Sequence, residues 1–379
     1  MKDALDGILV IELGTVLTAP LAGMMLADLG ARVIKVEHPD GGDPFRGRSA
    51  QPYSPHFAAY NRNKESIQLD LRSEADMAVL QQLLRRADVL LDNYRPGVLD
   101  RLGLHQEALK SLNRRLVHCS ITGFGATGPY RDHPCYDAVA LGFSGLASQM
   151  LDADEPAMSG PSTSDNITGM YACYGVLGAL MKRVRSGEGA RVEVNMLEAS
   201  IAFSPEGFEQ FNRLGATPRP DTRVAVSQSF AFLCGDQRQV TVHLSSVEKL
   251  WLAFVHVLER TDLLADERFT SASLRTANYA ELKAEVAPTF KTRSRDEWWA
   301  RLAQAGVPVA PVYAVPEVMH DLQVRHLQSF YQLAHPVHGS VTGVHRPVLI
   351  DGQRGPIHRP APVLGEDGDA IRGELGQAE

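Results

Sequence analysis

Short apolar runs alternate with helical segments through the first third of the chain, and this alternation limits the folds available to it. Residues 8–13 (ILVIEL) and 33–37 (VIKVE) predict buried strands. Between them, residues 20–29 predict a helix that opens on Pro20 and is followed by Gly30. Further along, residues 77–86 predict a helix and residues 88–94 and 116–122 predict strands. Strands that alternate with helices form parallel sheets covered on both faces, so the chain begins with a doubly wound α/β domain.

The pattern changes in the second half of the chain. Apolar residues at a 3.6-residue period predict a long helix over 167–185, followed by a short strand at 192–194 and a helix over 197–211. Residues 214–223 (LGATPRPDTR) have the composition of a linker. Beyond it, the predicted elements are a hairpin of strands 229–233 and 239–244, helices at 247–260, 279–289 and 295–304, and a C-terminal strand at 343–349. The region after the linker therefore reads as a smaller α+β module.

Charge and composition exclude several classes of protein. The 379 residues include 38 Lys and Arg against 45 Asp and Glu, a formal charge of −7, which lacks the positive field of a nucleic-acid or anionic-membrane binder. No apolar run is long enough to span a membrane, and residues 1–14 do not resemble a signal peptide. Four dispersed cysteines without a CxxC pair argue against a disulfide framework or a zinc site. We expect a cytoplasmic globular protein, and an enzyme on size.

Residues 123–128 (GFGATG) match G-x-G-x-x-G directly after a predicted strand. A dinucleotide site also needs a helix that begins within the motif, so that its N-terminus meets the pyrophosphate. Here the sequence continues as Pro129-Tyr-Arg-Asp-His-Pro134, which does not open a helix. The motif therefore predicts a glycine-rich loop whose backbone approaches a ligand or a reacting carbonyl.

Residues 162–166 (STSDN) immediately precede the long predicted helix. One interpretation makes Asp165 or Ser164 the N-cap of that helix. The other makes Asp165 a nucleophile towards an acyl group, kept ionised by the positive end of the helix. The two interpretations are compatible, and the residues alone leave both open.

Cations near the ends of predicted elements offer places to hold an anionic ligand. They are Arg62, Lys64, Arg72, Arg95 and Arg101. His335 and His338 lack the partners that a metal site needs, so we predict no metal.

Six segments in order resemble the family III CoA-transferases, which include formyl-CoA transferase and, as a side branch, α-methylacyl-CoA racemase. The segments are DGILVIELGTVLTAPLAGMMLADLGARVIKVEHPDGGDPFR, YNRNKESIQLDLRSE, DNYRPGVLDRLGL, LVHCSITGFGATGPYRDHPCYD, SDNITGMYACYGVLGALMKR and GVPVAPVYAVPEVMHDLQV. Only the middle module, about 214–300, has no matching segment.

The resemblance implies a domain organisation. Residues 1–200 and 325–379 would form a large Rossmann-like, CoA-binding α/β domain, and residues 225–305 a small α+β domain. Residues 201–224 and 306–324 would be the connecting linkers. Two such open-ring subunits are expected to interlock as a homodimer.

The resemblance also implies roles for individual residues. Asp165 would be the catalytic carboxylate, passing through an aspartyl anhydride and an aspartyl-CoA thioester. The expected CoA contacts are His38, Leu69, Arg72, Asn93, Tyr94, Arg101 and Tyr136. Arginine–phosphate hydrogen bonds are a physical reason for cations among them. CoA would be a substrate together with a small carboxylic acid, and no cofactor would be permanently bound.

Two positions separate the branches of the family. The racemases place a histidine where this chain has Tyr136, before Asp137, and usually a glycine where it has Asn93, so transfer is favoured over racemisation. Leu17 stands where formyl-CoA transferase has glutamine, and His38 where arginine is common, which argues against an oxalate/formate pair. The alternatives are a 2-methylacyl-CoA racemase or epimerase and a non-catalytic acyl-CoA-binding protein.

Overall fold

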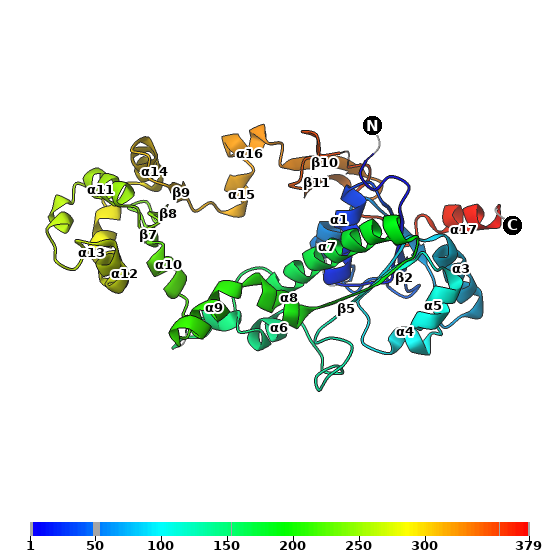
Figure 1. The fold of residues 1–379 in the computed structure, drawn as a ribbon. Helices are drawn as coiled ribbons and strands as arrows, with labels where there is room; N and C mark the ends of the chain where they lie inside the picture. The colour runs from blue at the N-terminus through cyan, green and yellow to red at the C-terminus, as the bar shows by residue number, and fades with distance from the viewer. Residues whose placement is uncertain (1–2, 48–53, 153, 356, 378–379) are drawn as a thin grey trace. The chain divides into compact units, whose positions relative to one another are not determined.

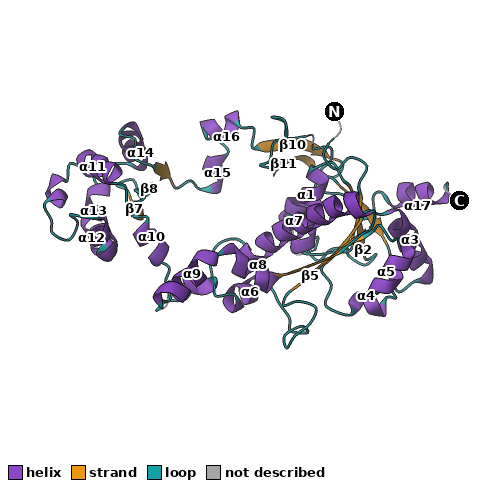
Figure 2. Ribbon diagram, viewed as in Figure 1, coloured by secondary structure: helices purple, strands orange, loops and turns teal. Residues whose placement is uncertain are grey.

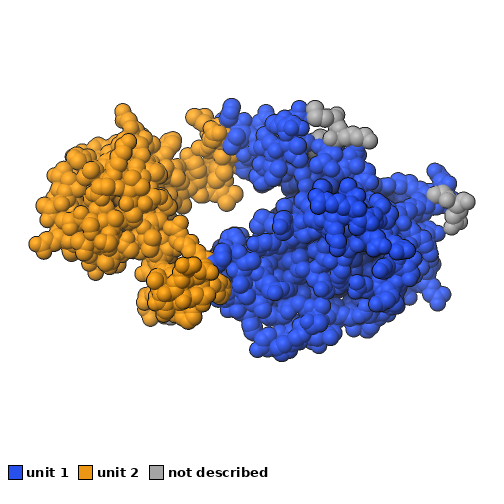
Figure 3. All heavy atoms as spheres, in the orientation of Figure 1, with its two compact units in different colours: residues 1–147, 158–205, 325–379 blue, residues 148–157, 206–324 orange. Residues whose placement is uncertain are grey.

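The computed structural model describes residues 3–47, 54–152, 154–355 and 357–377 of the chain. The chain divides into two compact units, which Figure 3 distinguishes by colour. Unit 1 comprises residues 1–147, 158–205 and 325–379, and unit 2 comprises residues 148–157 and 206–324. Unit 1 therefore contains both ends of the chain.

A six-stranded parallel sheet forms the centre of unit 1 (Figure 1). Its order is β3-β2-β1-β4-β5-β6, with β1 at Leu9–Glu12, β2 at Arg32–Glu37, β3 at Lys64–Gln68, β4 at Val89–Asp92, β5 at Val117–Thr122 and β6 at Arg191–Asn195. The predicted parallel α/β architecture is thus confirmed. The strand β3 was not predicted, because Lys64 and Ser66 interrupt its apolar pattern although both are buried.

Helices cover both faces of this sheet (Figure 2). On one face, α1 (Thr18–Asp28) and α7 (Thr163–Ser186) pack against side chains such as Val10 and Val33. On the other face, α3 (Glu74–Arg86), α5 (Gln106–Leu112) and the C-terminal α17 (Gly368–Gly376) pack with Ile11 and Ile34. Since neighbouring strand residues point to opposite faces, one apolar run supplies both cores, which explains why the strands read as continuous hydrophobic segments.

Short elements complete unit 1. They are α2 (Pro55–Tyr60), α4 (Val98–Arg101), α6 (Asp137–Phe143), the 3-10 turn Ala147–Gln149 at its boundary, α8 (Met196–Phe203), and the antiparallel pair β10 (Phe330–His335) and β11 (Gly339–Val344). On the way back from unit 2, α15 (Val315–Val318) still belongs to unit 2, and α16 (Leu322–His326) crosses into unit 1 at Arg325. The predicted strand at 343–349 is wrong, because β11 ends at Val344, where its pairing with Phe330 stops. The predicted helix at 197–211 is interrupted at Ser204, since Pro205 has no N–H to continue it.

The helices α1 and α7 lie against each other (Figure 1). A Cβ atom at Gly169 would lie 2.8 Å from the carbonyl oxygen of Thr18 and 2.9 Å from Leu21 Cδ2. A larger residue would therefore push the helices apart. The close approach brings the first turn of α7, which carries Asp165, next to the first turn of α1.

A cluster of buried charges lies beneath the first turn of α1. The Glu12 carboxylate is 3.0 Å from Lys35 Nζ and 2.9 Å from Lys64 Nζ, and Lys35 Nζ is also 3.0 Å from Asp43 Oδ2. All four side chains have no measurable solvent exposure. Buried charges persist only when paired, so these four residues depend on one another.

Unit 2 is a separate α+β body with its own core. Its sheet is antiparallel, in the order β7-β8-β9, and the predicted hairpin is confirmed as β7 (Ser229–Leu233) and β8 (Gln239–His243). The core gathers Trp251, Phe254 and Trp298, whereas Trp299 is 41% exposed. The other elements are α9 (Pro205–Leu214), α10 (Thr222–Val226), α11 (Glu248–Val257), the 3-10 helix Thr261–Leu264, α12 (Ala272–Ala277), α13 (Tyr279–Phe290), α14 (Arg295–Gln304) and β9 (Val309–Pro311).

Candidate active site

The opening most relevant to chemistry lies at the carboxyl edge of the unit 1 sheet. The strand order reverses between β1 and β4, and ligands of doubly wound sheets bind at such a point. A pocket of about 390 Å³ is found there, called below the Asp165 pocket. It is lined by residues 15–18 after β1, 93–96 and Val98 after β4, 121–123 at the end of β5, Arg131, His133, Cys135 and Tyr136, and by Asp165 and Met196.

Asp165 enters this pocket from the first turn of α7. The N-cap of α7 is Ser162, so the expectation that Asp165 or Ser164 caps the helix is wrong. The Ser164 hydroxyl bonds instead to Ser200, 2.7 Å away. The backbone N–H of Asp165 donates to Asp137 Oδ1 at 3.1 Å, and among the described residues no donor reaches the Asp165 carboxylate. The carboxylate is therefore available to a ligand in the pocket.

The ionisation of Asp165 differs from the expectation drawn from the helix end. Burial, and secondly the nearby Asp137 carboxylate, raise the pKa of Asp165 from 3.8 to about 7. The first-turn N–H groups do not compensate, because the side chain makes no hydrogen bond with them. A poorly solvated carboxylate that ionises near neutral pH is a stronger nucleophile and base than an exposed one.

This raised pKa predicts a stability effect of Asp165→Asn. Between the unfolded and folded pKa values the folded chain binds more protons, so stability falls as the pH rises from about 4 to about 7. The Asp165→Asn variant does not lose this stability, because asparagine does not ionise. We expect it to be more stable than the wild type at pH 8 by about 2 to 4 kcal/mol, allowing for partial exposure. Denaturant unfolding at several pH values measures this difference, which should shrink towards pH 4; a difference independent of pH would contradict the assignment.

The glycine-rich loop 123–128 leads into no helix until α6 at Asp137, as predicted. A Cβ atom at Gly123 would lie 2.2 Å from Cys135 Cβ, so only glycine allows the loop to fold back on itself here. Phe124 packs edge-on against Phe143 with ring centroids 5.0 Å apart. This folding brings Cys135 and Tyr136 to the wall of the pocket.

Three of the expected CoA-contact residues line the Asp165 pocket: Asn93, Tyr94 and Tyr136. The Asn93 amide is already engaged, because it accepts from Thr15 N at 3.0 Å and donates to Thr15 O at 2.7 Å and Thr18 Oγ1 at 3.1 Å. Its side chain therefore orders the loop after β1. Tyr136 is 66% exposed and remains free to contact a ligand.

The other four do not line this pocket. His38 Nε2 lies 3.9 Å from Asp70 Oδ1, and the backbone N–H of Leu69 donates to Glu37 O, so the carboxyl ends of β2 and β3 hold His38, Leu69 and Arg72 as one group. The Leu69 side chain is buried, which leaves only its backbone to contact a ligand. Arg101 is exposed at the end of α4.

Several pocket residues were not anticipated from the sequence as parts of the site. They are Thr15, Val16, Thr18, Arg131, His133, Cys135, Met196 and, as the partner of Asp165, Asp137. A carboxylate placed just after the glycine-rich loop was the available signal for Asp137. Burial and Asp165 raise the pKa of the Cys135 thiol to about 11, so Cys135 is a neutral group in this pocket.

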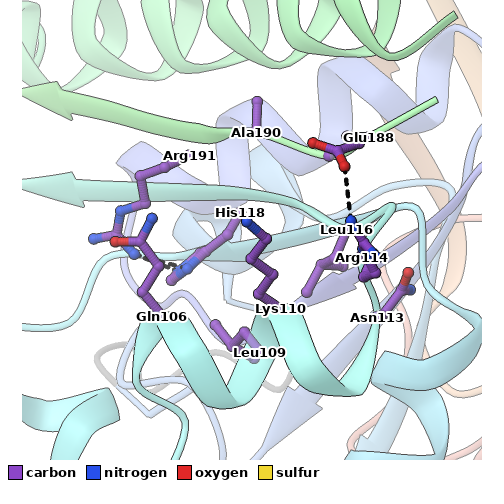
Figure 4. Close-up of a pocket in the computed structure, with 11 residues that line it drawn as sticks. Gln106, Leu109, Lys110, Asn113, Arg114, Leu116, His118, Glu188, Ala190 and Arg191 are labelled. Carbon is purple, nitrogen blue, oxygen red and sulfur yellow. Dashed lines mark hydrogen bonds and ion pairs between the residues drawn. The ribbon is translucent and has the colours of Figure 1, made fainter. Parts of the chain in front are cut away.

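A second pocket of about 140 Å³ lies beside α5 and is shown in Figure 4. There Arg191 Nη1 donates to His118 Nδ1 at 2.7 Å, which leaves His118 Nε2–H to donate to Asp92 Oδ2 at 2.7 Å. Arg114 pairs with Glu188 at its rim. The imidazole and the charged groups His118, Arg191, Arg114 and Glu188 of this pocket are therefore already engaged in interactions within unit 1.

The described residues also bear on two other classes of site. No group of three His, Cys, Asp or Glu side chains there is arranged to hold a metal ion. Within the same residues, no helix has the length and apolar character needed to cross a membrane.

Comparison with known proteins identifies the class of this fold and site. The sequence model of CoA-transferase family III matches residues 5–368. The chain is 34% identical to the acetyl-CoA:oxalate CoA-transferase of Acetobacter aceti, over 100% of this chain and 97% of that protein. It is 32% identical to the succinate–glutarate CoA-transferase of Agrobacterium fabrum, over 99% and 96% of the two chains.

Solved structures agree with this relationship. A CAIB/BAIF family protein from Brucella suis superimposes with a TM-score of 0.88 at 31% identity, covering 99% of this chain and 100% of that one. The chain belongs to CoA-transferase family III.

Proposed function

We propose that this enzyme transfers CoA from an acyl-CoA to a carboxylic acid with Asp165 as the covalent nucleophile. The observation that carries the proposal is the Asp165 carboxylate, which lies in a pocket at the switch point of the sheet without a hydrogen-bond partner among the described residues. A carboxylate suits this reaction because both of its acyl derivatives, the anhydride and the thioester, remain activated.

The proposed reaction has four balanced steps. Asp165 attacks the donor thioester carbonyl, forming an aspartyl–acyl anhydride and expelling CoA thiolate. The thiolate attacks the aspartyl carbonyl, which releases the donor acid and leaves an aspartyl-CoA thioester. The acceptor carboxylate attacks that thioester, giving a second anhydride and thiolate. The thiolate finally attacks the acceptor acyl carbonyl, which yields the new acyl-CoA and restores Asp165.

We further propose that CoA extends along the carboxyl edge of the sheet. Its adenine would lie by His38 and the Leu69 backbone, and its phosphates by Arg72 and Arg101. The thioester end would pass Tyr94 and Tyr136 to reach Asp165. The exposed cations and the three pocket residues support this direction, since each is near a strand end at the same edge.

The names of the relatives suggest which donor and acceptor acids to examine first. The relatives named above act on acetyl-CoA and oxalate and on succinate and glutarate. Small mono- and dicarboxylic acids are therefore the first substrates to examine. Arg95 and Arg131 line the pocket and suit a second carboxylate.

A panel of acyl-CoA donors crossed with carboxylate acceptors, read by mass spectrometry, tests the function. We expect at least one pair in which new acyl-CoA appears only when both partners are present. Deuterium exchange at the α-carbon of 2-methylacyl-CoA without an acceptor would instead support the racemase alternative. Binding without turnover on the whole panel would support the non-catalytic alternative.

We also propose that the enzyme acts as a homodimer. One face of α7 is apolar yet exposed, with Met170, Tyr174, Met181 and Val184 exposed by 46, 75, 61 and 79%. Their spacing of three, four and seven residues puts them on one side of the helix. A contiguous apolar face of this kind is expected at an interface.

The variant Tyr174→Asp tests this surface. A charge in the centre of a dimer interface costs enough to dissociate it, so we expect light scattering after gel filtration to give the mass of one chain instead of two. Glu107→Lys on α5, at the opposite face of the sheet, is the control and should leave the mass unchanged. A wild-type protein that is already monomeric would contradict the proposal.

A further inference from the structure

The backbone of residues 14–18, called here the pocket loop, is held by three side chains from elsewhere in unit 1. Lys35 Nζ donates to Gly14 O at 2.7 Å, and Asn93 bonds both the N–H and the C=O of Thr15. Both carboxylate oxygens of Asp43 accept from Val16 N at 3.2 Å. Each residue from 14 to 16 therefore has its own restraint.

Val16 needs such a restraint because its backbone is strained. Its φ is 68°, in the left-handed region that β-branched residues avoid. Without a partner for its N–H, Val16 would relax to an extended conformation and the loop would change course. The hydrogen bond to Asp43 opposes that relaxation.

Asp43 is itself fixed by burial and charge. Its carboxylate lies 3.0 Å from Lys35 Nζ, and neither side chain is exposed. It also accepts from Phe45 N at 2.9 Å, so its orientation is set from two sides. These charges lie outside the steps of CoA transfer, and a purely structural core would not require a charged pair here.

We propose that Asp43, supported by Lys35, is a positioning residue that holds Val16 in its left-handed conformation and so shapes the wall of the Asp165 pocket. Val16 and Leu17 line that pocket beside Asp165. The inference rests on the proposed function for its catalytic consequence. Its structural part, the link between Asp43 and the Val16 backbone, stands independently.

The test compares Asp43→Asn in two backgrounds, the wild type and Val16→Gly. Glycine adopts a positive φ without strain, so the loop keeps its course when the Asp43 carboxylate is lost. We expect Asp43→Asn to lower kcat by about 100-fold in the wild-type background and by less than about 10-fold in the Val16→Gly background. The thermal midpoint should respond in the opposite sense. Relaxation of Val16 recovers strain, so Asp43→Asn should lower the midpoint less in the wild-type background than in the Val16→Gly background.

Because kcat and the thermal midpoint are expected to respond oppositely in the two backgrounds, the experiment distinguishes a positioning role from a purely structural one. With a purely structural role, losses of activity would follow losses of stability. Gln237→Gly is the matched control, because Gln237 also has a positive φ of 63° but lies in the hairpin of unit 2. It should neither change activity nor modify the effect of Asp43→Asn. Should Asp43→Asn not fold, the double variant K35Q/D43N, which removes both buried charges, replaces it in the two backgrounds.

Equal losses of kcat in the two backgrounds, or losses of activity that parallel losses of midpoint, would overturn the proposal. If the wild type transfers CoA between no pair of acids, the proposed function fails. The thermal midpoints of the wild type, the two single variants and the double variant then still decide whether Asp43 holds Val16.

Discussion

Replacing Asp165 with alanine is expected to lower kcat for CoA transfer by about 10⁴-fold or more. The alanine has no oxygen with which to form either acyl intermediate, so only the direct reaction of acid with thioester remains. Steady-state kinetics on the best donor–acceptor pair measure the loss. A residual kcat within tenfold of the wild type would exclude covalent catalysis by Asp165.

The neighbouring carboxylate provides the matched control. Asp137→Asn removes the like charge that helps to raise the pKa of Asp165. We expect this variant to retain covalent chemistry while the acidic limb of its pH profile for kcat/KM moves to lower pH. If Asp137→Asn instead lowered kcat as severely as Asp165→Ala and left the pH profile of kcat/KM in place, Asp137 and not Asp165 would be the nucleophile.

Replacing Glu12 with glutamine is expected to cost about 3 to 5 kcal/mol of unfolding free energy. Glu12 is the carboxylate shared by Lys35 and Lys64, and its loss leaves two fully buried ammonium groups with one remaining carboxylate, that of Asp43. Far-ultraviolet circular dichroism in denaturant is the suitable measurement, because all three tryptophans, at 251, 298 and 299, lie in unit 2.

The control for Glu12 is an exposed pair. Glu209→Gln breaks the contact with Arg213 on α9, where both side chains are mostly in water. Such pairs contribute within about 0.5 kcal/mol, so this variant should unfold like the wild type. If Glu12→Gln and Glu209→Gln lowered the free energy of unfolding by similar amounts, burial would not determine how much the charge cluster contributes to stability.

The sheet was predictable where apolar runs are uninterrupted. The strands β1, β2 and β4 were recognisable because each contributes apolar side chains to the cores on both faces, and β5 because Val117, Cys119 and Ile121 enter one core. By contrast, β3 contains Lys64, whose charge is satisfied by Glu12, 52 residues earlier in the chain. No local pattern reveals such a pairing. The same holds for the strand near the C-terminus, whose register depends on its partner β10.

Several residues of the site could be predicted from the sequence, but their burial, hydrogen bonds and pKa shifts could not. Asp165, Asn93, Tyr94 and Tyr136 do meet in one pocket. The upward shift of the Asp165 pKa was not foreseen. It depends on burial and on Asp137, which is brought close by the fold of the glycine-rich loop. The use of the Asn93 amide in ordering Thr15 likewise depends on contacts between the ends of β1 and β4. The CoA contacts, the homodimer and the cytoplasmic location stay predictions.

Covalent catalysis by Asp165 is tested most directly by capturing the enzyme during turnover. The wild type is mixed with an acyl-CoA donor, treated with hydroxylamine, digested and analysed by peptide mass spectrometry. Since hydroxylamine attacks an activated acyl carbonyl, we expect a hydroxamate on Asp165, formed only in the presence of donor and absent from Asp137. Sustained CoA transfer without any modification of Asp165, or with the modification on another carboxylate, would contradict covalent catalysis by this residue.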